Sequence, residues 1–124
     1  MEVERESMDY DVVVVGAGPS GLSTAIKLKQ LNPEINVCVL EKGSEVGAHI
    51  LSGNVFETRA LDELIHDCRS KDSPIKTKVT KEKFLFLSKK GSLNWPTWLL
   101  ASVQKNHKNY IISLANLCLS LIHI

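Results

Sequence analysis

The stretch from Tyr10 to Gly21 constrains this chain more than any other, because four consecutive valines run directly into the turn Gly16-Ala17-Gly18-Pro19-Ser20-Gly21. Consecutive β-branched residues favour a strand that is buried on both faces of a parallel sheet. The glycines permit a tight turn, a close approach of a pyrophosphate, and close packing of a following helix on the strand. Unpaired N–H groups and the positive dipole end of that helix attract the pyrophosphate. The sequence therefore predicts a dinucleotide site.

The segment after this turn predicts the rest of a β–α–β unit. Apolar residues recur there at helical spacing: Leu22, Ala25, Ile26, Leu28 and Leu31. Pro33 ends the helix, because the residue before a proline disfavours the helical conformation. Asn36–Leu40 then reads as a second buried strand, and Glu41 follows it.

Glu41 lies about 20 residues beyond the glycine turn, which is the spacing of the acid that binds an adenosine ribose. A carboxylate there accepts both ribose hydroxyls, and its charge disfavours a 2′-phosphate. The alternative is an ordinary acid at a strand end, which the spacing does not favour. Lys42 either pairs with a neighbouring acid or is solvated.

Gly43–Gly53 holds three glycines in eleven residues, which indicates close backbone approaches or positive φ angles rather than regular structure. A simple nicotinamide-binding unit usually continues from the acid into another helix, so this stretch favours a larger cofactor. We interpret His49 as a loop histidine that bonds backbone rather than as a catalytic base. No partner for base chemistry is evident, and no catalytic residue is predicted.

The remaining segments read as a small set of elements. Thr58–His66 predicts a short amphipathic helix, and Lys76–Lys83 an exposed edge strand. Phe84–Trp95 predicts a β-hairpin with a glycine in its turn. Thr97–Val103 is apolar and is either a small buried loop or part of an interface. Ile111–Leu121 predicts another helix with an apolar face.

The composition argues against several classes of function. Fifteen basic and fourteen acidic residues leave a net charge of +1, and nothing favours a nucleic-acid partner. The three cysteines form no CxxC pair, so no metal site or disulfide framework is predicted. Cys38 and Cys118 are interpreted as buried structural thiols. The longest uncharged stretch, Tyr110–Ile124, is shorter than the ~20 residues of a spanning helix.

The two ends of the chain carry separate predictions. Residues 1–9 are acidic, without the features of a targeting segment, and are expected to be a tail. Residues 119–124 back-translate as CTG-TCT-CTT-ATA-CAC-ATC, which resembles a transposase sequencing adaptor read in frame, so we interpret them as an artefact. A different nucleotide sequence under these codons would remove that hypothesis. Two buried strands are too few for a doubly wound sheet, so the chain is expected to be truncated.

Three blocks of sequence resemble the N-terminal part of the electron transfer flavoprotein–ubiquinone oxidoreductases: YDVVVVGAGPSGLSTAIKLKQL, VCVLEKGSEVGAHILSG and KNHKNYIISLANL. The first occurs in many flavoproteins, whereas Gly47–Gly53 directly after EKGSEV is much more specific. Ala60–Leu64 and Asn106–Ile111 follow in the family's order and spacing. Lys108 stands where the family more often has glycine. The resemblance covers nearly all of Tyr10–Cys118.

The resemblance implies an α/β fold: a Rossmann-like FAD-binding domain, with a βαβ unit, a parallel sheet and a small β-hairpin insertion, of which residues 10–118 are an incomplete N-terminal part. It implies FAD contacts from Gly16, Gly18, Pro19, Ser20, Gly21, Glu41, Lys42, Gly47, Ala48, His49, Leu51, Ser52 and Gly53. Leu51, Val55 and Phe56 either contribute to an apolar membrane-facing surface or lie in the core.

Enzymes of this family carry FAD and a [4Fe–4S] cluster, and pass electrons from reduced electron transfer flavoprotein to ubiquinone at a membrane surface. The cluster cysteines are expected downstream of this chain, so no metal ligand is assigned within it. The chain by itself is expected to be inactive. Without the targeting extension of mitochondrial members it resembles bacterial ones, which implies the cytoplasmic face of the inner membrane. Eukaryotic relatives are expected at the mitochondrial inner membrane.

Two alternatives stay open at the level of sequence. The first is another FAD enzyme of the same fold, such as a geranylgeranyl reductase or an aromatic hydroxylase, for which Gly47–Gly53 together with Asn106–Ile111 is not expected. The second is a non-catalytic nucleotide-binding module that uses NAD. The glycine-rich stretch after Glu41 argues against it.

Overall fold

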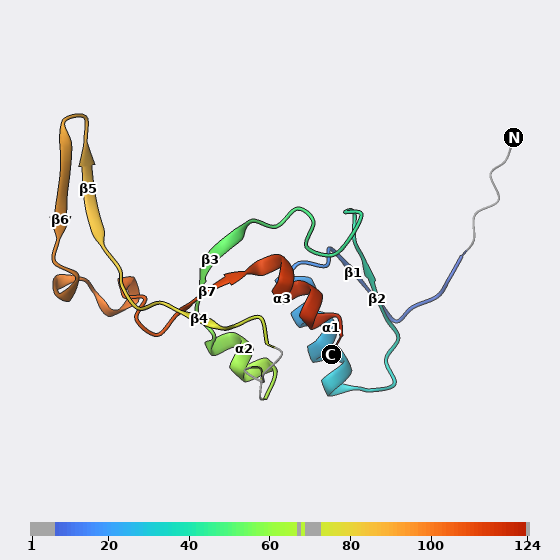
Figure 1. Cartoon of the computed structure of the whole chain (residues 1–124). Helices are drawn as coiled ribbons and strands as arrows, with labels where there is room; N and C mark the ends of the chain where they lie inside the picture. Colours follow the sequence, from blue (N-terminus) through green and yellow to red (C-terminus); the bar gives the residue numbers. More distant parts are fainter. Residues whose placement is uncertain (1–6, 67, 69–72, 124) are drawn as a thin grey trace, which may run out of the picture. The chain divides into compact units, whose positions relative to one another are not determined.

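The computed structural model describes residues 7–66, 68 and 73–123 (Figure 1). The chain divides into two compact units, one of Met1–Ile50 with Leu114–Ile124 and the other of Leu51–Ser113. Both contain helices and strands, so the chain is a mixed α/β protein. Within its described part, no helix is long and apolar enough to cross a bilayer.

The first unit contains the predicted β–α–β arrangement. Strand β1 (Val12–Val15) pairs in parallel with β2 (Val37–Leu40), and helix α1 (Pro19–Leu31) connects them. The register places Val12 opposite Val37 and Val15 opposite Leu40. α1 ends where Pro33 requires it, with the N–H of Asn32 donating to the carbonyl of Leu28.

The prediction that β1 is buried on both faces is wrong for this structure. Val15 is 84% exposed and Val13 50%, whereas Val12 and Val14 are half-buried. Successive side chains of a strand point to opposite faces, and Val14 is the valine that lies next to α1, near Gly21. α1 therefore covers one face of the strand. Leu31, predicted to close the apolar stripe of α1, is 73% exposed at the end of the helix.

Helix α3 (Leu114–Leu121) contributes the rest of the first unit's core and contacts α1. The buried apolar residues of this unit come from the glycine turn, α1 and α3: Ala17, Leu22, Leu117, Cys118 and Leu121. Cys118 is fully buried, as predicted, whereas Cys38 is half-buried. α3 runs through residues 119–121, and the adaptor hypothesis for residues 119–124 stays a prediction about the nucleotide sequence.

The second unit contains a three-stranded antiparallel sheet in the order β3 (Ser52–Phe56), β7 (Tyr110–Ser113), β4 (Thr77–Lys78). The predicted helix over Ile111–Leu121 is wrong for its first part, because residues 110–113 pair with both other strands. β-branched isoleucines suit such a central strand, and Ile112 is 3% exposed. The predicted lysine-rich edge strand is confirmed, although only two residues form it.

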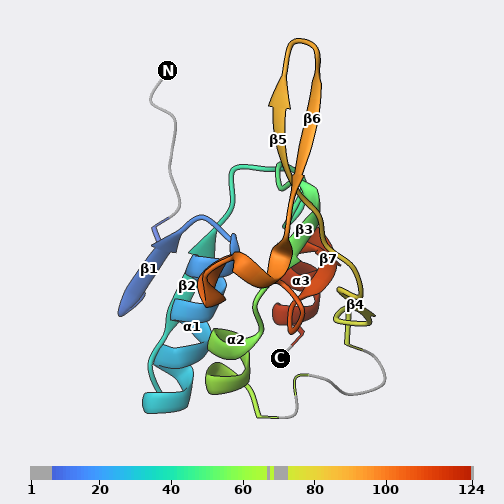
Figure 2. The same ribbon diagram turned by 90° about the vertical axis from the view of Figure 1, so that its left-hand side faces the viewer.

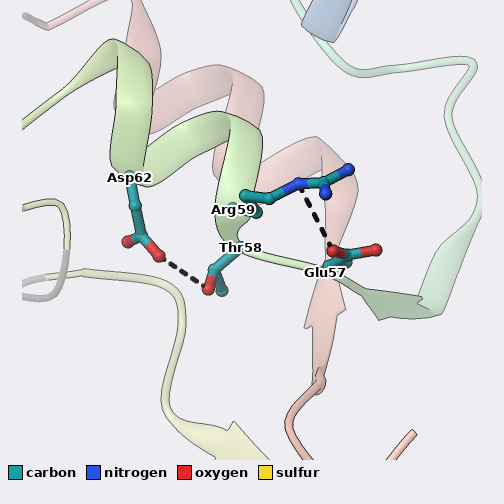
Figure 3. Close-up of polar contacts among 4 residues, drawn as sticks. All are labelled: Glu57, Thr58, Arg59 and Asp62. Carbon is teal, nitrogen blue, oxygen red and sulfur yellow. Dashed lines mark hydrogen bonds and ion pairs between the residues drawn. The ribbon is translucent and has the colours of Figure 1, made fainter. Parts of the chain in front are cut away.

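Helix α2 (Arg59–Leu64) lies within the predicted helical segment, and Thr58 stands at its N-cap. Figure 3 shows that the Thr58 hydroxyl donates to the carboxylate of Asp62 at 2.9 Å rather than capping a backbone N–H. The Arg59 side chain lies beside Glu57, with 3.6 Å between Nε and Oε1. Both members of this ion pair are exposed, so its contribution to stability is small.

The predicted hairpin is present as β5 (Phe84–Ser88) and β6 (Gly91–Trp95). Its two strands pair with each other, and the hairpin stands away from the three-stranded sheet of its unit (Figures 1 and 2). Two short 3₁₀ turns follow, η1 (Thr97–Leu99) and η2 (Ser102–Gln104). The segment is not the buried loop that one of the two sequence interpretations proposed, because Trp98 is 75% exposed and Val103 92%.

Candidate functional site

The glycine turn takes its shape from two glycines that no other residue replaces without strain. Gly16 has φ = +102°, a conformation that disfavours residues with a Cβ. A Cβ added to Gly21 would lie 2.0 Å from the carbonyl oxygen of Gly16. α1 therefore begins in direct backbone contact with the end of β1, as the sequence predicts for the first and third glycines.

Gly18 is the glycine that the fold itself does not need. It is the N-cap of α1 with φ = −76°, and a Cβ there would meet nothing within 4 Å. Pro19 occupies the first helical turn, where a missing N–H is tolerated. Ser20 is exposed, and no acidic residue lies in this turn. The helix therefore presents an open positive end with space for an anion close to the backbone.

The parallel pairing of β1 and β2 brings Glu41 to the glycine turn. The N–H of Gly16 donates to the carbonyl of Leu40 at 2.7 Å, which extends the pairing by one residue beyond the end of β1. The Glu41 carboxylate then accepts hydrogen bonds from two backbone N–H groups, those of Ala17 at 2.8 Å and Gly43 at 2.7 Å. Oε2 accepts the bond from Ala17, and Oε1 accepts the bond from Gly43. The carboxylate is thus fixed between the two loops and keeps lone pairs for further donors.

These bonds also set the charge of the site. The N–H groups of Gly43 and Ala17 hold the pKa of Glu41 below its usual value, and a nearby His49 acts in the same direction. Glu41 is therefore ionised at neutral pH. His49 and Lys42 are both exposed. A Cβ on Gly43 would lie 3.1 Å from Glu41 Oε1 and 3.4 Å from His49 Nδ1, so these three residues are neighbours.

The next glycine of the predicted stretch packs against α3. Gly47 has φ = +89°, and a Cβ there would lie 2.9 Å from the Cα of Ala115. Residues 45–50 form tight turns, in which the N–H of Ala48 donates to Glu45 and the N–H of Ile50 to Gly47. Gly47 is therefore constrained both by its backbone conformation and by a close approach, as the sequence indicated.

The predicted site residues divide between the two units. Those from Gly16 to His49 belong to the first unit, whereas Leu51, Ser52 and Gly53 begin the second. Irregular structure was predicted for these three, but Ser52 and Gly53 belong to β3. Gly53 has φ = +77° at a shift in the pairing of β3 with β7, which is a β-bulge. Leu51 and Val55 are exposed and Phe56 is half-buried.

Sequence reasoning missed two parts of the site, the N–H groups of Ala17 and Gly43. The Ala17 amide gives no sequence signal, because any residue other than proline supplies one. Gly43 could have been found from its place two residues after Glu41, where a side chain would crowd the carboxylate. The Ala17 bond does not follow from the linear spacing, since only the parallel pairing brings its loop to Glu41. The Gly43 bond is local, because the two residues lie two positions apart in the chain.

A hollow of about 740 Å³ opens beside this carboxylate. Aliphatic side chains of α1 and β2 line most of it, among them Leu22, Ile26 and Val39, and Glu41 and Ala17 contribute as well. Its lining thus combines apolar side chains with the Glu41 carboxylate. No cluster of three or more metal-ligating side chains occurs among the residues that the structure describes.

Comparisons with known proteins agree with this geometry. Residues 1–85 match the Thi4 family. The electron transfer flavoprotein–ubiquinone oxidoreductase of Oryza sativa, named as mitochondrial, is 56% identical over 91% of this chain and 20% of its own length. The Pseudomonas aeruginosa protein of the same name is 52% identical over 94% of this chain and 22% of its own.

A probable electron transfer flavoprotein–ubiquinone oxidoreductase of Acinetobacter baylyi is 50% identical over 92% of this chain and 21% of its own length. The chain thus spans about a fifth of the length of these relatives. The match extends over both units, far beyond the glycine turn that many nucleotide-binding proteins share. The chain belongs to the Thi4 family and is a homologue of the electron transfer flavoprotein–ubiquinone oxidoreductases.

Proposed function

We propose that the first unit binds the ADP part of FAD and is the beginning of a Rossmann-like domain. The observation that carries this proposal is the Glu41 carboxylate, held by the Ala17 and Gly43 N–H groups beside the open start of α1. A pyrophosphate at the N-terminus of α1 and a ribose on Glu41 are the arrangement that this spacing serves. Gly18, whose missing Cβ leaves free space, admits the phosphates to the backbone.

We further propose that the protein is an electron transfer flavoprotein–ubiquinone oxidoreductase, since relatives of that name are 50–56% identical to it. Bound FAD would supply the redox chemistry, while the residues of this chain bind and orient it. Cys38, Cys68 and Cys118 are too few for the four thiolates of a [4Fe–4S] cluster. We expect the cluster ligands in sequence outside this chain.

The hairpin of the second unit is the proposed contact with the membrane. The register places Phe84 opposite Trp95 and Phe86 opposite Leu93, so these four side chains share one face. Phe86 makes edge-to-face contacts with Phe84 and Trp95, with ring centroids 5.3 and 5.8 Å apart. Phe86, Leu93 and Trp95 are nevertheless exposed. Exposed apolar patches mark interaction sites, and tryptophan is enriched where a membrane meets water.

Two measurements test the proposal. Titration of the purified chain with FAD, NAD and NADP tests the nucleotide site, and FAD should bind in preference to both. A chain that binds NAD and excludes FAD would overturn the assignment. The complete protein encoded by the gene, assayed with reduced electron transfer flavoprotein and a short-chain ubiquinone, tests the reaction. Oxidation of the donor without reduction of the quinone would refute the proposed acceptor.

A further inference from the structure

The basic residues of this protein are concentrated in the segment of sequence that contains the hairpin. Eight of its fifteen basic residues and one of its fourteen acidic residues lie between Lys76 and Lys108. The whole chain has a net charge of only +1, so the rest of it is acidic on balance. The hairpin, with its exposed apolar side chains, therefore lies in the most basic segment of the sequence.

Four of these lysines stand at the two ends of the hairpin. Lys81 and Lys83 precede β5, Lys89 and Lys90 form the turn between the strands, and all four side chains are exposed. Strands of this length span about 17 Å. The apolar face defined by Phe84, Phe86, Leu93 and Trp95 thus lies between two pairs of cations.

The open edges of the hairpin determine how it meets a membrane. In the described part of the chain, β5 and β6 pair only with each other, so the outer edge of each strand carries unpaired backbone groups. Such groups are strongly disfavoured in hydrocarbon. Insertion turn-first would also carry Lys89 and Lys90 into the apolar layer. The hairpin therefore lies along the surface, with its apolar face at the acyl boundary and its lysines among the headgroups.

We propose that the lysines at the two ends of the hairpin bind the anionic headgroups of a lipid leaflet, so that the hairpin selects anionic over neutral membranes. This inference rests on the proposed membrane contact and names the lipid class that it recognises. A leaflet offers negative charge at both ends of the hairpin and hydrocarbon between them in a single plane. Lysines near such a surface gain attraction that salt screens.

The tryptophans of this chain provide the assay. It has two, Trp95 and Trp98, and both lie at the hairpin. Their fluorescence is followed while the chain is titrated with vesicles of phosphatidylcholine alone, or of phosphatidylcholine mixed with phosphatidylglycerol. At low ionic strength, four lysines should make partitioning into the mixed vesicles about 10²- to 10³-fold stronger, with a blue shift of the emission.

Matched variants distinguish the effect of the hairpin lysines from the effect of the protein's net charge. Lys90→Gln should weaken partitioning into mixed vesicles about 5-fold, and Lys89→Gln with Lys90→Gln about 25-fold. Lys27→Gln, an exposed position on α1 in the other unit, removes the same charge and should leave partitioning unchanged. Brominated lipids test the orientation, since bromines near the headgroup should quench both tryptophans more than bromines deep in the chains.

Each other outcome overturns a defined part of the argument. Equal partitioning into neutral and mixed vesicles would refute the lysine role but leave the membrane contact standing. Binding to neither kind of vesicle would refute both, and strong quenching by deep bromines would refute the orientation along the surface. The flavin assignment has its own readout in the FAD titration, so its failure is recognised separately.

Discussion

Substitution of the glycines in the turn by alanine separates the glycine that the fold needs from the one that the ligand needs. In Gly21→Ala, the new Cβ would lie 2.0 Å from the Gly16 carbonyl oxygen, whereas about 3.4 Å is an ordinary contact. Both partners belong to the backbone, so α1 has to move away from β1. We expect this variant to lower the free energy of unfolding by about 3 kcal/mol, at the upper end of overpacking.

Gly18→Ala is the matched control for the fold. Its φ of −76° is open to alanine, and the new Cβ meets nothing within 4 Å. Reduced freedom of the unfolded chain and a poorer N-cap oppose each other, so stability should change by less than about 0.5 kcal/mol. Affinity for FAD should nevertheless fall about 10- to 100-fold, because the methyl group keeps a phosphate from the backbone and removes a charged hydrogen bond.

The assay combines urea unfolding of the ligand-free chain, followed by circular dichroism, with FAD titration of each variant. The expected pattern is a loss of stability in Gly21→Ala and a loss of FAD affinity without loss of stability in Gly18→Ala. An unchanged urea midpoint for Gly21→Ala would refute the close packing of α1 on β1. A Gly18→Ala variant that binds FAD as the unchanged chain does would refute the phosphate position.

Three further predictions concern single side chains. Folding lowers the pKa of Glu41 from its ordinary value of 4.5. The stability that the carboxylate contributes is therefore present above pH 4.5 and is lost as the pH falls through the pKa of the folded protein. Glu41→Gln should abolish that part of the pH dependence of the free energy of unfolding, measured in urea. Burial and the Glu41 charge raise the pKa of the Cys118 thiol, and a thiol with a raised pKa is alkylated slowly because the thiolate is the reactive form. Mass spectrometry after alkylation should therefore find the half-buried Cys38 modified first and Cys118 modified only when the protein unfolds. Ile112→Ala should destabilise by about 2–4 kcal/mol and its exposed neighbour Ile111→Ala by less than about 1 kcal/mol; equal effects would refute the inward orientation of Ile112.

The local elements of the first unit were predictable because their signals are local. The valine run, the glycine turn, the helical spacing from Leu22 and the stop at Pro33 each act over a few residues, and the structure places β1, α1 and β2 accordingly. The hairpin was found for the same reason, since alternation and a glycine turn specify it. The family resemblance, carried by longer blocks, is confirmed by the relatives.

The predictions that were wrong concern features that depend on tertiary packing. Ile111–Leu121 has an apolar pattern that suits a strand or a helix, and only the partners β3 and β4 make its first part a strand. The exposure of Val15 depends on which face of the sheet α1 covers, which the run of valines does not encode.

The sequence by itself determined the glycine turn, the place of Glu41 after the second strand and the family, because those depend on residue types at fixed spacing. Only the tertiary structure decided what holds that acid. The Gly43 N–H is a local partner, whereas the Ala17 N–H is a backbone group that nearly every residue has, and it reaches the Glu41 carboxylate because β1 and β2 pair in parallel. Hydrogen bonds between backbone and a distant side chain depend on how the strands pair, which the order of residues alone does not show.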